Sequence, residues 1–147
     1  MKIYEITKNK KEYLDLLLLA DEEENMVDKY LTDGTMFVID DNGVKGEIVL
    51  LEKEDEVLEI KNLAVNQNFQ KNGYAKKLID FVIEKYKNTY KKLIVGTGDS
   101  PLTIPFYEKC GFKRSFIVKN FFVDNYSKPI IENGIRLIDM IYLERKF

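Results

Sequence analysis

Apolar and polar residues alternate with a period of two at the start of the chain and then recur at helical spacing. The alternation over residues 2–6 predicts a strand, and the apolar positions between 12 and 20 share one face of a helix. A second helix follows directly and ends at Asp33-Gly34, a common stop signal. Asp21 with Glu24 three positions later has the spacing of a capping box, so we expect Asp21 to cap this helix. The chain therefore begins with a strand and two helices.

Short apolar runs separated by turn residues follow the two helices. They predict strands over residues 36–39, 44–51 and 57–65, and the Asp, Asn and Gly residues at 40–43 predict the first turn between them. Strands joined by short connections usually pair with their neighbours in sequence, so an antiparallel meander is expected. From Gly73 to about residue 90 the apolar period changes to 3.6, which predicts the clearest helix of the chain.

The remaining pattern predicts a strand over 92–95, a short helix over about 103–110, a long strand over 112–123 and a final strand over 137–143. A strand that follows a helix favours a parallel crossover, which would return residues 92–95 to the same sheet. Pro105 should make the short helix start late or bend, and Asn133-Gly134 is a hairpin signal. The predicted fold class is therefore mixed α/β, or α+β.

The length and composition are those of one globular domain over residues 1–147. Of the 147 residues, 45% are hydrophobic and 33% are charged, within the ordinary globular range. The net charge of −2 lacks the basic surplus that tracks a nucleic acid backbone. The longest apolar run, residues 16–20, is too short to span a membrane, and the first residues lack the apolar segment of a secretion signal. We expect a cytoplasmic protein with neither nucleic acid nor membrane as a partner.

The sequence contains no histidine and a single cysteine, Cys110. Without histidine there is no Ser-His-Asp or Cys-His nucleophile and no histidine-ligated metal site, so we expect no metal. One cysteine cannot form an intrachain disulfide, which fits a reducing compartment. No histidine is available to convert Cys110 into a reactive thiolate, and we expect it to pack as a small apolar side chain.

The connection between strand 57–65 and the main helix has the features of an anion site. The first N–H groups of a helix have no partner within the helix, and the helix dipole adds partial positive charge there. Gly73 lets the backbone approach a ligand closely, and Lys71, Lys76 and Lys77 can add charge. On physical grounds alone, this region is a weak signal for phosphate binding.

Two ordered motifs strengthen that signal. The run Gln70-Lys71-Asn72-Gly73-Tyr74-Ala75 matches the Gln/Arg-x-x-Gly-x-Gly/Ala signature of the GNAT superfamily of N-acetyltransferases, and Tyr107-Glu108-Lys109-Cys110-Gly111-Phe112 is similar to its second signature, Tyr-x-x-x-Gly-Phe. The order of strands and helices resembles the same family over essentially the whole chain. The resemblance implies a mostly antiparallel central sheet of about six or seven strands, flanked by about four helices and containing a splayed parallel pair.

The resemblance also implies which residues contact acetyl-coenzyme A, the co-substrate of this family. The backbone amides between Lys71 and Lys76 would hold its pyrophosphate, and Ala75 must stay small for that approach. The strand end 62–65 would splay from its parallel neighbour 92–95, leaving backbone groups free for the pantetheine arm. The implied contacts are Leu63, Ala64, Val65, Gln70, Lys71, Asn72, Gly73, Tyr74, Ala75, Lys76 and Ser100, the last standing where the family commonly has an asparagine.

An amine attacks a thioester only in its neutral form. For a lysine-like acceptor with a pKa of about 10.4, neutralisation at pH 7 costs roughly 4.6 kcal/mol, so a positioned base matters. By the resemblance, Glu59 matches the strand glutamate that acts as general base in the histone-acetylating branch of the family. Glu47 on the neighbouring strand is the substitute, and deprotonation through waters is a third route. An α-amine with a pKa near 8 would cost roughly 1.4 kcal/mol and need no dedicated base.

Tyr107 would lie near the departing sulfur, where the family uses this tyrosine as general acid. A phenol with a pKa of about 10 gives its proton to a thiol of about 8.5 only uphill, by roughly 2 kcal/mol. We therefore expect a hydrogen bond from Tyr107 to the developing thiolate rather than a complete proton transfer.

The resemblance implies an acetyl-coenzyme A-dependent N-acetyltransferase whose primary amine acceptor attacks directly in a ternary complex. One alternative is a module that binds acetyl-coenzyme A as a sensor or docking signal without turnover, and another is a structural adaptor that does not bind it. Acidic residues on the expected acceptor side, among them Asp21 and Asp33, favour a cationic amine. The late hairpin and final strand offer an edge at which a second copy could form a homodimer.

Overall fold

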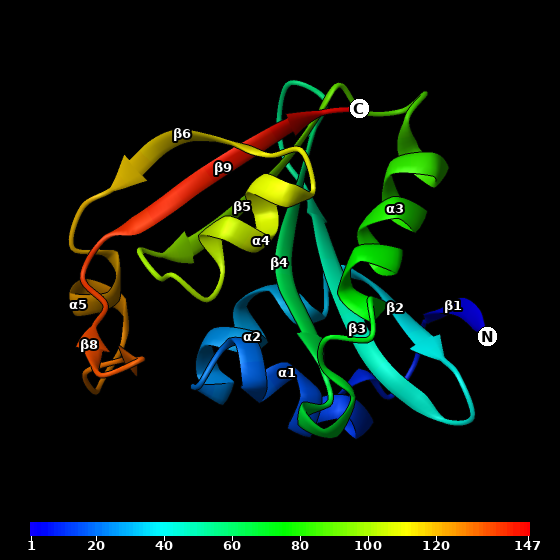
Figure 1. Ribbon diagram of the computed structural model, residues 1–147, viewed down its shortest axis with the longest axis horizontal. Helices are drawn as coiled ribbons and strands as arrows, with labels where there is room; N and C mark the ends of the chain where they lie inside the picture. Colours follow the sequence, from blue (N-terminus) through cyan, green and yellow to red (C-terminus); the bar gives the residue numbers. More distant parts are fainter.

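The computed structural model describes residues 1–147 and centres on a seven-stranded sheet of order β1-β2-β3-β4-β5-β9-β6 (Figure 1). Every neighbouring pair in this sheet is antiparallel except β4 and β5. The strands are β1 (Lys2–Ile6), β2 (Thr35–Asp40), β3 (Val44–Glu52), β4 (Val57–Val65), β5 (Lys92–Gly98), β6 (Lys113–Val118) and β9 (Met140–Lys146), with β7 (Ile131–Glu132) and β8 (Ile135–Arg136) forming a separate hairpin. The fold class, the meander and the parallel crossover expected from the sequence are confirmed.

Helices cover both faces of the sheet. They are α1 (Leu14–Ala20), α2 (Glu24–Leu31), α3 (Tyr74–Tyr86), α4 (Ile104–Lys109) and α5 (Phe121–Asn125), with short 3-10 turns at Lys10–Tyr13 and Gln67–Phe69. One core lies between α3 and the sheet, where Leu78 and Ile79 pack with Ile48. The other lies under α1 and α2, where Leu17 and Val27 pack with neighbouring strand residues. Because both faces are buried, the central strands read as nearly continuous apolar runs.

The parallel pair separates along its length. Residues Val57 to Ile60 of β4 pair in register with Lys92 to Val95 of β5, and no pairing continues beyond them. A β-bulge between β3 and β4 falls at the same level, because Val49 faces Asn62 whereas Leu50 faces Ile60. Bulges bend the strand that carries them, and Figure 1 shows β4 and β5 diverging after they run side by side. The separation of the two strands was expected between residues 62–65 and residues 92–95. In the structure residues 92–95 are paired with 57–60, and it is residues 61–65 of β4 that separate from residues 96–98 of β5.

The long strand expected over 112–123 is wrong in its second half. β6 ends at Val118, and α5 begins at Phe121. Asn120 makes the turn between them with a φ of 58°, and its N–H donates to Asp139 Oδ1 at 2.8 Å. Phe122 then buries its ring with Ile130 and Leu137. This small core redirects the chain, and alternation along the sequence could not reveal it because its members come from separate segments.

The last strand was also expected at the wrong place in the sheet. β9 begins at Met140 rather than at 137 and lies between β5 and β6, so it is not a free edge. The strand at this edge of the sheet is β6, and all six of its residues are exposed. Pro105 lies in the first turn of α4, where a missing N–H breaks no helical bond, so the helix neither starts late nor needs to bend.

Five α-helices are present, close to the expected number of about four. The helix cap expected at Asp21 is wrong. Asp21 does not cap α2, whose N-cap is Glu23 without a side-chain cap, because the Asp21 carboxylate accepts hydrogen bonds from tyrosines instead. None of the helices is both long enough and apolar enough to cross a membrane.

Candidate active site

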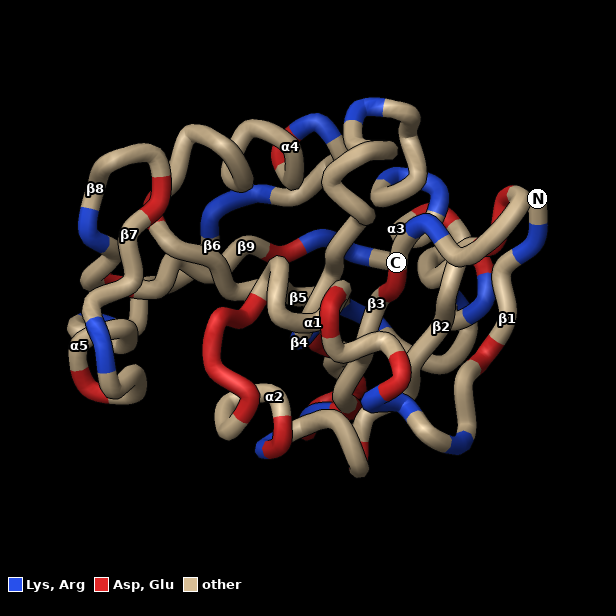
Figure 2. The backbone as a smooth tube through the Cα atoms, turned by 90° about the horizontal axis from the view of Figure 1, so that it is seen from below, with Lys and Arg blue, Asp and Glu red and all other residues tan.

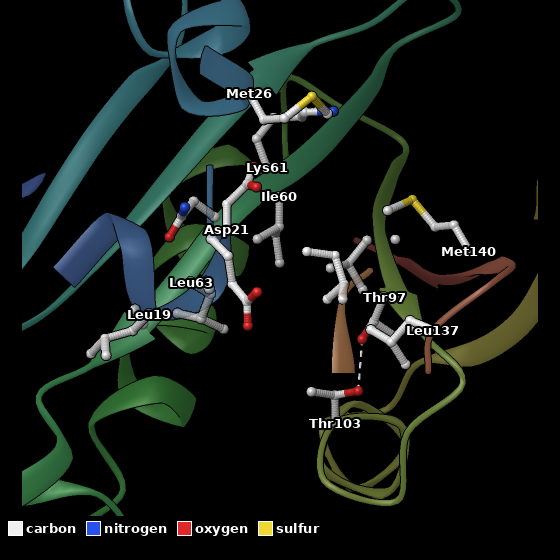
Figure 3. Close-up of a pocket in the computed structure, with 18 of the residues that line it drawn as sticks. Leu19, Asp21, Met26, Ile60, Lys61, Leu63, Thr97, Thr103, Leu137 and Met140 are labelled. Carbon is white, nitrogen blue, oxygen red and sulfur yellow. Dashed lines mark hydrogen bonds between the residues drawn. The ribbon is translucent and has the colours of Figure 1, made fainter. Parts of the chain in front are cut away.

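A cavity of about 470 Å³ lies where β4 and β5 separate. Its walls come from these two strands, the α1–α2 connection, α4 and the segment between α5 and β9. In Figure 3, Asp21 and Leu63 lie on one side of the cavity, and Thr97 and Leu137 lie on the other. The expected site residues that line it are Glu59, Leu63, Ala64, Val65, Gln70 and Tyr107.

The β4 wall presents backbone groups as well as side chains. Beyond Ile60 the edge of β4 that faces β5 has no strand partner. One carbonyl on this stretch is used, because Gln70 Nε2 donates to the Val65 oxygen at 3.3 Å. The rest of the 61–65 edge can bond an extended ligand in the way that a further strand would.

The loop before α3 presents main-chain N–H groups rather than side chains. Gly73 has a φ of 82°, and a Cβ built on it would have nothing within 4 Å. Its carbonyl accepts the N–H of Lys77, which leaves the N–H groups of residues 74–76 as unpaired donors of the first turn. Tyr74 and Lys76 turn their side chains elsewhere, to Asp41 and Asp80 respectively. A helix start with open space above a glycine fits a pyrophosphate.

Tyr107 reaches the cavity from α4. Its ring is 8% exposed and packs edge-to-face against Phe112, and burial raises the pKa of its hydroxyl above the ordinary value. A hydrogen bond of 2.7 Å between the Thr97 and Thr103 hydroxyls joins the end of β5 to the residue that precedes α4 (Figure 3). Tyr107 is therefore a protonated donor, placed where the two strands part.

Glu59 lies on β4 at the floor of the cavity and is 3% exposed. Its Oε2 accepts a hydrogen bond from the Tyr142 hydroxyl at 3.0 Å and lies 3.3 Å from Lys61 Nζ. Its Oε1 lies 3.8 Å from Lys53 Nζ. Burial, and next the Glu59 charge, raise the pKa of Tyr142, so this tyrosine stays a donor.

Glu47 and Ser100 do not line the cavity. Glu47 on β3 is fully buried, and neither of its carboxyl oxygens has a hydrogen-bond partner. Burial raises its pKa well above the ordinary value, which favours the neutral acid. The Ser100 hydroxyl accepts the N–H of Leu102 within the turn before α4. Cys110 is buried, and desolvation raises the pKa of its thiol.

The structure places a second carboxylate in the cavity wall, that of Asp21, which we expected on the acidic acceptor side and also as a helix cap. Asp21, 9% exposed, accepts hydrogen bonds from the Tyr30 hydroxyl at 3.0 Å and the Tyr126 hydroxyl at 2.6 Å. Asn62 Nδ2 donates to the Tyr30 oxygen at 3.0 Å, which extends the network to β4. Burial raises the pKa of Asp21, although both tyrosine hydrogen bonds oppose this effect.

The acidic run 21–24 also joins two distant parts of the chain. Ser127 donates its hydroxyl to Glu23 Oε2 at 2.7 Å and its N–H to the same oxygen at 3.0 Å. Figure 2 shows this acidic connection before α2 on the side that faces α5 and β7. Residues more than a hundred positions apart thus close one side of the cavity, and no local sequence signal marks such a pairing.

Comparison with known proteins identifies similar chains. Residues 32–114 match the family model described as acetyltransferase (GNAT) domain. Among curated proteins, the uncharacterized N-acetyltransferase YvbK of Bacillus subtilis is 39% identical over 135 residues, which cover 90% of this chain and 87% of that protein.

Two solved structures share the fold over nearly their whole length. A GNAT family acetyltransferase from Elizabethkingia anophelis with acetyl-CoA bound is 43% identical, with a TM-score of 0.93, and the match covers 99% of this chain and 97% of that one. A Bacillus subtilis acetyltransferase in complex with CoA is 36% identical, with a TM-score of 0.90, and the match covers 99% and 98% of the two chains.

Proposed function

The chain belongs to the GNAT family and is an acetyl-CoA-dependent acyltransferase, and from this premise we propose that it acetylates a primary amine by direct attack in a ternary complex. The observation that carries the proposal is the cavity at the split between β4 and β5, beside the N-terminal loop of α3. A thioester laid along the free edge of β4 would meet an amine that enters through this cavity.

The residues present fit acetyl-CoA as the acyl donor. The main-chain N–H groups at 71–76 would hold its pyrophosphate, with Gly73 leaving room above the helix start. The backbone of Leu63, Ala64 and Val65 would bond the pantetheine arm and polarise the thioester carbonyl. The relatives that hold acetyl-CoA and CoA in their structures support the same ligand here. Acetyl-CoA supplies an activated acetyl group, so no covalent enzyme intermediate is required.

Glu59 is the base that we favour. It lines the cavity, whereas Glu47 is fully buried on β3 opposite Ala64 of β4 and does not line the cavity. A carboxylate held by the Tyr142 hydroxyl and flanked by Lys61 can take the proton released when the amine nitrogen bonds to the acetyl carbon. As the carbon–sulfur bond breaks, Tyr107 would donate a hydrogen bond to the thiolate, a role supported by its buried, protonated hydroxyl.

Amine-dependent turnover tests this function. Purified protein is mixed with acetyl-CoA and a panel of amines, amino acids, peptides and polyamines. Released CoA thiol is measured with a colorimetric thiol reagent, and the acetylated product is identified by mass spectrometry. We expect thiol release that depends on the amine and yields one N-acetyl group per thiol. Tight acetyl-CoA binding with no turnover on any amine would contradict catalysis and favour a sensor.

A further inference from the structure

We propose that the acceptor is a compact amine with a second cationic group, and that this second cation binds Asp21 while the first amine is acetylated. This inference rests on the proposed function, because it assigns the acceptor of the same cavity. The α,ω-diamines have the simplest form of this chemistry: two ammonium groups separated by an alkyl chain.

Asp21 has no cationic partner within the chain. The carboxylate is buried in the cavity wall, yet none of the ion pairs in the structure includes it. Lys61, the cation that acts on it, lies 3.3 Å from Glu59 and is committed there. The two tyrosine hydroxyls supply hydrogen bonds without charge. Buried carboxylates are normally paired with a cation, and an ammonium ion of the acceptor would complete this pair.

The cavity wall has more hydrogen-bond acceptors than donors to satisfy them. Two lining residues have a buried oxygen without a partner, Asn62 at Oδ1 and Glu132 at Oε2. Asn62 is itself 2% exposed, so bulk solvent does not satisfy it. The nearby hydroxyl donors, Tyr30 and Tyr126, are already directed at Asp21. A wall with surplus acceptors fits a ligand with surplus donors, and an ammonium group has three donors and no acceptor.

The space between these polar groups is lined largely by apolar side chains. Apolar side chains from three segments of the chain line it: Leu19, Met26, Phe122, Ile130, Leu137 and Met140. The bond from Tyr126 to Asp21 joins two walls of the cavity, and the Ser127 bond to Glu23 holds the same two segments together, which favours a compact acceptor over the side chain of a folded protein. An alkyl chain would lie against the apolar wall with a polar group at each end.

Equilibrium binding tests the assignment without requiring turnover. The full chain is saturated with CoA and titrated calorimetrically with α,ω-diamines of four to eight carbons and with n-alkylamines of the same lengths. Charge-assisted hydrogen bonds predict that the best diamine binds roughly 10- to 100-fold more tightly than its matched monoamine. Asp21→Asn should abolish this preference, and Tyr126→Phe, which keeps the carboxylate, should retain it.

The outcomes separate this inference from the proposed function. Equal binding of diamine and monoamine to the wild-type protein overturns the inference, as does a preference that survives removal of the Asp21 charge. If Asp21→Asn does not fold, Asp21→Ser supplies the second variant, and the wild-type comparison still decides. The CoA titration that precedes each run tests the proposed function by itself: failure of CoA to bind contradicts that function, whatever the amines do.

Discussion

Tyr142 donates its hydroxyl to Glu59 across an intervening strand. The bond is 3.0 Å long and joins β9 to β4 although β5 lies between them. The Tyr142 side chain can pass over β5 only because residue 96, its partner on that strand, is a glycine. A Cβ at Gly96 would lie 2.9 Å from Tyr142 Cζ, which is too close. Phe116 of β6 stacks on the other side of the ring, with centroids 4.5 Å apart. Three strands therefore fix the position of one carboxylate at the floor of the cavity.

Glu59→Gln should lower kcat while leaving acetyl-CoA binding intact. The amide keeps the shape of the side chain but cannot accept a proton, so we expect a loss of roughly 10²- to 10⁴-fold at pH 7. The loss should shrink as pH rises, because more of the acceptor is then already neutral. The measurement is kcat between pH 6 and 9.5, with the Kd of acetyl-CoA measured alongside.

Tyr142→Phe is the matched control for the Glu59 variant. It removes the hydrogen bond and keeps both the carboxylate and the ring that stacks on Phe116. We expect a smaller loss of kcat and an unchanged dependence on pH. A Glu59→Gln enzyme with wild-type kcat and pH profile would exclude Glu59 as the base and leave waters or Glu47.

Tyr107→Phe should lower kcat without loss of acetyl-CoA affinity. The ring that packs against Phe112 remains, so the protein should fold, and only the hydroxyl donor of this cavity-lining residue is lost. Removing one donor to a developing anion typically costs roughly 10²- to 10³-fold in rate. Steady-state kinetics at saturating amine measure this loss. An unchanged kcat would show that the tyrosine only fills space.

The sequence was sufficient for the parts of the site that depend on neighbouring residues. Gly73 and the motif around it lie in a contiguous run, and a helix start presents its N–H groups whatever packs behind it. The parallel pairing of β4 with β5 follows from a strand, a helix and a strand in order, whereas the split between them was expected only from the family resemblance. These features depend on neighbouring residues or on the order of the elements, so they can be recognised in the sequence.

The sequence was insufficient where the cavity depends on distant pairs. Asp21 and Tyr126 are 105 positions apart, and neither residue type nor spacing marks the bond between them. The local pattern predicted that Asp21 caps α2. In the structure its carboxylate instead accepts hydrogen bonds from Tyr30 and Tyr126. The same holds for α5, where burial of Phe122 against Ile130 overrides the strand-like alternation of residues 112–123.

Gly73→Ala should raise the KM for acetyl-CoA by at least about tenfold with a smaller effect on kcat. Its φ of 82° costs an alanine roughly 1–2 kcal/mol, and the added methyl would occupy the open space assigned to the pyrophosphate. Gly134→Ala is the control, because its φ is 75°, its surroundings are equally open and it lies in the β7–β8 hairpin. Both variants should lose similar stability, and only Gly73→Ala should change KM. Equal KM values would contradict the assigned phosphate loop.

Glu47→Gln should stabilise the protein at neutral and alkaline pH but not in acid. Burial raises the pKa of Glu47 above its ordinary value of 4.5, so the folded state binds this proton more tightly than the unfolded state does. Its contribution to stability is complete below about pH 4.5 and is lost progressively as pH rises through the folded pKa. A neutral glutamine avoids this loss. At pH 8 each unit by which the folded pKa exceeds the unfolded pKa costs the wild-type protein about 1.4 kcal/mol, and this cost sets the expected gain in the free energy of unfolding.

Urea unfolding between pH 4 and 9 measures the difference between wild type and Glu47→Gln. Glu54→Gln is the control, because Glu54 is exposed in the turn between β3 and β4 and its replacement should leave the pH profile unchanged. The two stability curves should meet near pH 4.5 and diverge above it, because only the wild-type protein must then bury a charge or retain a proton. Curves that stay parallel, or a variant that loses stability at every pH, would mean that the folded protein holds Glu47 ionised beside a partner.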